Sequence, residues 1–224
     1  MRLGDNVVWQ VDELGDYVHF ARRFAERALR DGAPCVYVRF APHPPVLAPA
    51  PGITVVEVDP GRGFDAFSGA ILRLAGEAGR GVRHVFDNLS ALAAPWTTDE
   101  QIANFFQFAC PYLFELDTVA YFALTRRKHD SRAIARIRDT TQVLFDLFRA
   151  GGHLYVHPLK AAGRYAPQMF LPHRLAGEEL APAFPSGSGP GPAANPARPA
   201  LTAPERSIAP WESVYRRLLE YRGN

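Results

Sequence analysis

The sequence predicts an α/β domain with a mainly parallel β-sheet and helices on both faces. Six short runs are apolar on both of their faces, which is typical of strands covered on both sides. Segments with an apolar residue at every third or fourth position lie between most of these runs and predict helices. Because predicted strands and helices alternate along the chain, we expect the strands to pair in parallel.

The predicted strands are rich in valine and aromatic residues, which favour the extended conformation. They cover residues 6–11, 35–40, 53–58, 82–86, 118–124 and 153–157.

The predicted helices follow from apolar periodicity over residues 17–28, 64–78 and 134–148. Gly151 is placed to end the last of these. Thr98 and Gln101 form a capping-box pattern that predicts the start of a further helix. Pro111 is expected to kink or end that helix, because proline lacks the backbone N–H that a helix interior needs.

The composition changes near residue 180, and this divides the chain. Residues 1–178 are predicted to form one folded domain. Residues 181–210 hold eight of the chain's 20 prolines, so we predict a disordered linker over 179–209. A short amphipathic helix is expected at 210–224, with Trp211 and Leu218 on its apolar face.

The bulk properties are those of an ordinary globular protein. The net charge of +2 gives no reason to expect nucleic-acid or membrane partners. No signal peptide is visible, and no apolar run approaches the roughly 20 residues that span a bilayer. We therefore expect a cytoplasmic protein. Cys35 and Cys110 stand in apolar surroundings without metal-ligand spacing, and we predict buried free thiols.

Several segments resemble RecA/KaiC-like ATPases over about residues 4–173. GDNVVWQV at 4–11 resembles the entry strand of that family, and VFDNLS at 85–90 resembles its Walker B strand, with Asp87 as the aspartate. PLKAAGR at 158–164 resembles the late strand and its basic loop. This resemblance implies a RecA/P-loop NTPase-like fold.

Longer strings point to a narrower relationship. The strings at 4–11, 110–124, 156–160 and 169–173 resemble the KaiC-like N-terminal region of some bacterial proteins related to pyruvate phosphate dikinase or phosphoenolpyruvate synthase. The resemblance implies a protein partner, either an ATP-grasp/phosphohistidine-type enzyme or further copies of this chain. The dikinase chemistry itself would need domains that this chain does not contain.

The residues that would bind a triphosphate depart from the family pattern. A functional P-loop needs a glycine-rich turn, a lysine and a Ser/Thr hydroxyl after the first strand. Here residues 11–17 read VDELGDY, with one glycine, no lysine and three carboxylates. The next strand ends in VRFA at 38–41, without the glutamates that orient the attacking water in KaiC-like ATPases. We therefore expect no functional P-loop, no cofactor, and ATP/Mg only through a non-standard site.

The candidate site residues lie at predicted strand ends, where α/β proteins bind ligands. Each also has a structural interpretation: helix N-terminal carboxylates, a capped turn or a solvated basic loop. Ser90 lacks a Gly-x-Ser-x-Gly context, so the sequence gives no support for a hydrolase triad. The candidates for ligand or partner binding are Asp12, Asp16, Asp87, Ser90, Arg126, Arg127, Lys160 and Arg164.

Two functions follow from this pattern. The first is a non-catalytic, pseudo-ATPase module that binds or regulates a phosphoenolpyruvate synthase-like or dikinase-like protein. The alternative is a nucleotide-binding protein in which Arg126, Arg127, Lys160 and Arg164 contact the anion without a P-loop. In neither case do we expect this chain by itself to act as a phosphotransferase, although the sequence does not decide whether it is an enzyme.

Overall fold

The computed structural model describes residues 1–94, 98–165 and 169–183. Within them, one nine-stranded sheet has the order β3-β2-β4-β5-β1-β6-β7-β8-β9. Pairs from β3 to β6 are parallel and pairs from β6 to β9 are antiparallel, which confirms the α/β class with a mostly parallel sheet. The strands are β1 Asn6–Val11, β2 Cys35–Arg39, β3 Ile53–Glu57, β4 Arg83–Asn88, β5 Val119–Thr125, β6 Val143–Ala150, β7 His153–Ala161, β8 His173–Ala176 and β9 Glu179–Pro182.

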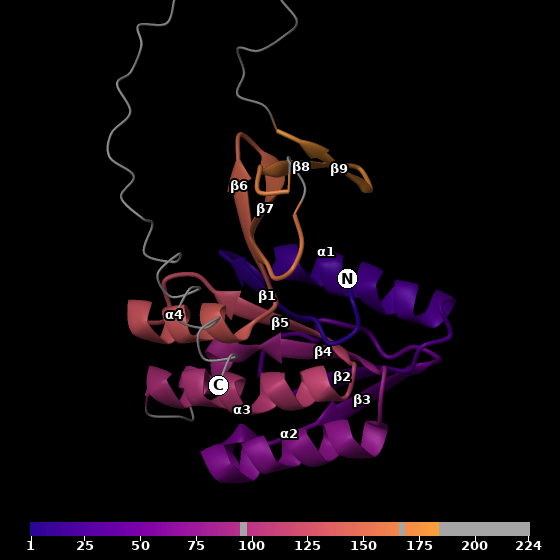
Figure 1. The fold of residues 1–224 in the computed structure, drawn as a ribbon, viewed down its shortest axis with the longest axis vertical. Helices are drawn as coiled ribbons and strands as arrows, with labels where there is room; N and C mark the ends of the chain where they lie inside the picture. The colour runs from indigo at the N-terminus through magenta and orange to yellow at the C-terminus, as the bar shows by residue number, and fades with distance from the viewer. Residues whose placement is uncertain (95–97, 166–168, 184–224) are drawn as a thin grey trace, which may run out of the picture. The chain divides into compact units, whose positions relative to one another are not determined.

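Four α-helices cover the sheet in two layers. Helix α1 lies on one face, and α2, α3 and α4 lie on the other (Figure 1). The helices are α1 Leu14–Arg30, α2 Phe64–Ala78, α3 Asp99–Glu115 and α4 Ser131–Thr140, with 3₁₀ turns η1 at Pro60–Arg62 and η2 at Leu89–Ala93.

Alternation along the central strand β1 explains why the sheet is buried on both faces. Val7, Trp9 and Val11 pack with the side chains of α1. Val8 belongs to the apolar cluster on the other face, with residues of α2 and α3. A strand whose successive side chains enter two different cores needs apolar residues on both faces, which is the pattern seen at Val7, Val8 and Trp9.

The structure overturns the helix predicted over 134–148. Helix α4 ends at Thr140, and Val143–Ala150 is strand β6, which pairs with β1 and β7. A short run of large apolar residues fits either a buried helix or a strand, and the open edge of β1 decided for the strand. Gly151 does not end a helix. With Gly152 it forms the two-residue β6–β7 turn, both at positive φ (55° and 77°), as glycine permits.

Helix α3 differs from its prediction in the Thr98 cap, and it does not end at Pro111. It begins after Thr98 as expected, but the Thr98 side chain makes no capping hydrogen bond. Pro111 lies inside the helix, which continues to Glu115. An interior proline costs about 3 kcal/mol. Burial of Cys110 and Leu113 on either side of Pro111 offsets this cost.

The C-terminal part of the sheet was not predicted. Strands β8 and β9 form an antiparallel pair, and β9 at Glu179–Pro182 lies within the range predicted as linker. The rest of that linker, from residue 184, and the helix expected at 210–224 lie outside the described residues.

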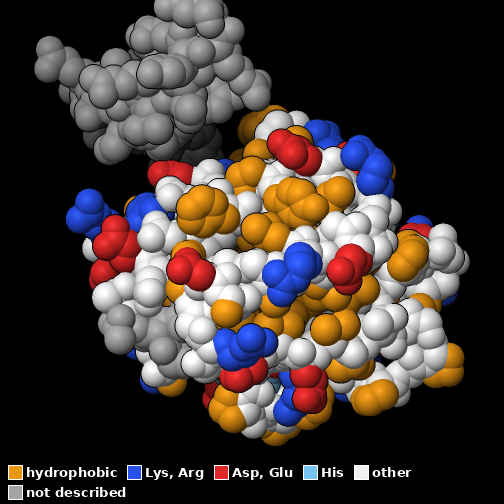
Figure 2. All heavy atoms as spheres, turned by 90° about the horizontal axis from the view of Figure 1, so that it is seen from below, with side chains coloured by type: hydrophobic (Ala, Val, Ile, Leu, Met, Phe, Trp, Pro, Cys, Tyr) orange, Lys and Arg blue, Asp and Glu red, His pale blue; other side chains and the backbone are white. Residues whose placement is uncertain are grey.

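The predicted thiols are confirmed, and the surface charge is mixed. Cys35 and Cys110 are buried and free. Burial raises the pKa of the Cys35 thiol to about 11. On the face shown in Figure 2, basic and acidic side chains are interspersed among apolar ones. In the described part of the chain, no helix is long and apolar enough to cross a membrane.

Candidate functional site

The carboxyl ends of β1, β4 and β5 meet where the chain leaves neighbouring strands in opposite directions. After β1 the chain enters α1 on one face, whereas after β4 and β5 it enters α3 and α4 on the other. In open α/β sheets ligands bind outside the carboxyl ends at such a switch point. Asp12, Asp87, Ser90 and Arg126 all follow or end these strands, so the predicted site residues converge on this edge.

The connection from β1 to α1 is too short for a phosphate loop. Only Asp12 and Glu13 separate Val11 from Leu14. A P-loop wraps several backbone N–H groups around the phosphates and needs a longer, glycine-rich segment. Asp16, in the first turn of α1, is 5% exposed and accepts hydrogen bonds from Arg149 Nη2 and Nε at 2.6 and 3.1 Å. Its carboxylate is therefore neutralised within the domain.

Arg126 links the ends of β1 and β5 to the middle of β6. Its Nη2 donates to Asp146 Oδ1 at 2.5 Å and to the carbonyl of Leu147 at 2.8 Å, and its Nη1 lies 3.4 Å from Asp12 Oδ2. Burial raises the pKa of Asp146, although the charge of Arg126 opposes the shift. Two carboxylates thus compete for this guanidinium, which reduces its capacity to bind an external anion.

Asp87 makes hydrogen bonds inside the domain and does not face the solvent. It is fully buried, and it accepts hydrogen bonds from the Tyr37 hydroxyl and from the backbone N–H groups of Phe40 and Ala41 at 2.9 and 3.0 Å. The carboxylate therefore fixes the chain as it leaves β2. Burial, followed by the hydrogen bond to Asp87, raises the pKa of Tyr37. It is Asn88, one residue later, that caps the turn by accepting from the N–H of Ser90 at 3.1 Å.

Ser90 takes part in a hydrogen-bonded chain that sequence reasoning missed. Its Oγ lies 2.7 Å from His129 Nε2, and His129 Nδ1 lies 2.8 Å from Asp99 Oδ1. The backbone N–H of Thr125 donates to the same Oγ at 2.8 Å. Asp99 also accepts from the N–H of Asp130 at 2.7 Å.

These hydrogen bonds set the pKa of Asp99 and the position of the proton on His129. Burial would raise the pKa of Asp99, but the hydrogen bonds from His129 and Asp130 outweigh it and hold the pKa below its ordinary value. An ionised Asp99 can only accept, so His129 Nδ1 carries a proton, and in the neutral ring Nε2 is then the nitrogen that accepts from Ser90. No local motif marks this set, because its members are distant in the sequence.

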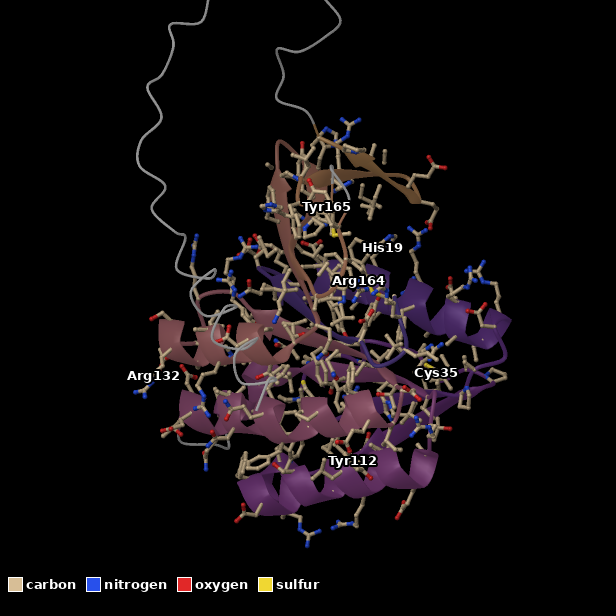
Figure 3. All side chains as sticks on the ribbon, viewed as in Figure 1. His19, Cys35, Tyr112, Arg132, Arg164 and Tyr165 are labelled. Atoms are coloured by element: carbon tan, nitrogen blue, oxygen red, sulfur yellow. The ribbon has the colours of Figure 1, made fainter. Side chains whose placement is uncertain are left out.

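The other predicted cationic residues do not gather around one ligand. Lys160 Nζ donates to the carbonyls of Arg138 and Asp139 near the end of α4, at 2.5 and 3.0 Å, and burial lowers its pKa. Arg164 lies against the body of the domain (Figure 3) and makes two hydrogen bonds to Asp5, at 2.6 and 2.9 Å. Arg127 is exposed, in the loop after β5.

The described residues of this edge form no metal-ligand cluster, and an open groove lies elsewhere in the domain. Among the described residues, no group of three or more His, Cys, Asp or Glu side chains is placed to hold a metal ion. An open groove of about 630 Å³ lies elsewhere, between β3 and α2, and its lining includes Glu57, Asp59, Arg62 and Arg73. None of the predicted site residues lines it.

Comparison of the sequence with protein-family models and with curated proteins found no match.

Proposed function

We propose that this chain is a cytoplasmic binding or regulatory module on a RecA/KaiC-like α/β domain that no longer hydrolyses ATP. It acts with a phosphoenolpyruvate synthase-like or pyruvate phosphate dikinase-like protein, or with further copies of itself. The observation that carries the proposal is the two-residue β1–α1 connection, which leaves no loop to hold a triphosphate. Buried free thiols at Cys35 and Cys110 are in keeping with a reducing compartment.

The internal use of Asp87 supports the loss of ATPase activity. A Walker B-type aspartate must face a Mg²⁺ ion at the strand end. Asp87 instead has no exposed surface, and both of its oxygens accept hydrogen bonds from the protein. The family partner is inferred from the sequence strings alone, and the domain edge near Asp12 and Arg126 is the surface we assign to it.

The alternative, a nucleotide site without a P-loop, has less support. Of its four cationic side chains, Arg126, Lys160 and Arg164 are held by protein carboxylates or carbonyls. A nucleotide would have to compete with those contacts for each group.

Thermal unfolding with and without millimolar Mg-ATP tests the proposal, together with a phosphate-release assay. A ligand at 100 times its dissociation constant stabilises a protein by about 2.7 kcal/mol. We expect no shift and no phosphate release. Hydrolysis that disappears in Asp87→Asn would overturn the proposal, and a shift without hydrolysis would favour the alternative. For the partner, we expect binding to a phosphoenolpyruvate synthase or dikinase, weakened by Asp12→Arg.

A further inference from the structure

Ser90, His129 and Asp99 have the relative geometry of a serine nucleophile, its general base and the carboxylate that orients the base. The Oγ–Nε2 and Nδ1–Oδ1 distances are 2.7 and 2.8 Å, within the range for such pairs. Because Thr125 N–H donates to Ser90 Oγ, the hydroxyl proton is left to point at His129. The Ser90 residue is partly exposed, the Asp99 side chain is 22% exposed and the His129 side chain has no exposed surface, so these three residues reach the surface at Ser90 and at Asp99.

The local backbone supports a site at this position. Ser90 follows β4 at the start of a 3₁₀ turn, and the β4–β5 register shifts between Val85 and Asn88. Bulges of this kind re-aim side chains beside active sites. Arg127, two residues before His129, has φ of 61°, a left-handed conformation that non-glycine residues seldom adopt. Both irregular segments lie at the switch-point edge of the sheet.

We propose that Ser90 is a nucleophile for acyl transfer, with carboxylic esters as the substrate class. This function goes beyond the proposed binding role and does not depend on it. His129 is the general base and Asp99 is a positioning residue. The chain order, Ser90 then Asp99 then His129, is one of the orders in which such triads occur.

The reaction balances with water as the only co-reactant. Ser90 Oγ bonds to the ester carbonyl carbon while its proton passes to His129 Nε2. The carbon–alkoxy bond then breaks, and the alkoxide leaves as an alcohol with that proton. Water attacks the acyl-serine and gives its proton to His129 Nε2; the bond between the acyl carbon and Ser90 Oγ then breaks, and His129 returns that proton to Ser90 Oγ. The products are a carboxylic acid and the restored serine.

Labelling of the full chain with a fluorophosphonate probe, followed by peptide mass spectrometry, tests this assignment directly. We expect one covalent adduct on Ser90 of the folded wild-type protein, and none after heat unfolding. Because the mechanism needs an unprotonated histidine nitrogen to accept the serine proton, the labelling rate should rise with pH. Hydrolysis of p-nitrophenyl acetate should follow the same pH profile.

Three variants separate a nucleophile from a structural hydrogen bond. Ser90→Ala should abolish the adduct, and Asp99→Asn should slow labelling at least about tenfold while flattening its pH profile. Ser131→Ala, at an exposed serine that begins α4, is the matched control and should label like wild type. Absence of an adduct on Ser90 in folded wild-type protein would overturn the proposal. So would labelling whose rate and pH profile are unchanged in Asp99→Asn.

Discussion

His84 should lower the free energy of unfolding as pH falls from 7 to 5, a range in which few other groups titrate. The residue is 1% exposed near the start of β4, between Val36 of β2 and Ala120 of β5. Within the described residues neither ring nitrogen has a hydrogen-bond partner. Burial therefore lowers the pKa of His84 from 6.5 to about 4.

The sign and size of the effect follow from linkage. Above pH 6.5 the ring is neutral in both the folded and unfolded states, so it adds no pH dependence. Below that value the unfolded chain takes up a proton first, and stability falls until the folded-state pKa of about 4 is reached. Between pH 7 and pH 5, this difference lowers the free energy of unfolding by about 2 kcal/mol.

Urea unfolding at pH 7 and pH 5 measures this loss for the wild type and for His84→Leu. Leucine fills similar space in the same apolar surroundings and cannot titrate. We expect the variant to lose about 2 kcal/mol less than the wild type over this pH interval. His153→Gln changes an exposed histidine at the start of β7, and its loss should equal that of the wild type. Equal losses for the wild type and His84→Leu would refute the reasoning.

Three further predictions concern stability, and the first two test whether predicted site residues hold the fold together. Asp87→Ala leaves the Tyr37 hydroxyl and two backbone N–H groups without their acceptor, and should cost about 3–5 kcal/mol in urea unfolding; a loss below about 1 would contradict the internal role of Asp87. Arg164→Met leaves the buried Asp5 carboxylate unpaired and should lower the free energy of unfolding by about 3 kcal/mol. Arg127→Ala, at an exposed position, is the control and should change that free energy by no more than about 0.5 kcal/mol. Gly152→Val forces a β-branched residue to φ 77° in the β6–β7 turn and should lower the melting temperature by several degrees, measured by circular dichroism; an unchanged value would count against that turn.

Most of the parallel sheet could be predicted from the sequence because its signal is local. Strand β1 has the predicted bounds, and α1 and α2 follow the predicted apolar stripes. The helix predicted over the residues of β6 was wrong for a physical reason. Its apolar residues recur at a spacing that fits a helix, but Val143 and Leu144 gain more by pairing with β1, whose other edge is taken by β5.

The site residues were found individually, but their roles were not. Asp87 and Ser90 were recognised as strand-end polar groups. The partners of Asp87 are Tyr37 and the N–H groups of Phe40 and Ala41, all on a different strand or loop. The Ser90 hydroxyl contacts His129, in the loop after β5, and the backbone N–H of Thr125 at the end of β5, and Asp99 of α3 contacts it only through His129. Hydrogen bonds between segments leave no periodic pattern in the sequence.

The sequence by itself determined the alternation of strands and helices, the double burial of the sheet and the lack of a phosphate-binding loop. Each of these depends on residue types within one short segment, where hydrophobic period and turn chemistry act directly. Only the tertiary structure decided which charges neutralise one another, that residues 143–150 form a strand, and that Ser90, His129 and Asp99 are aligned. Those outcomes depend on contacts between distant segments, whose energies exist only once the sheet has brought them together.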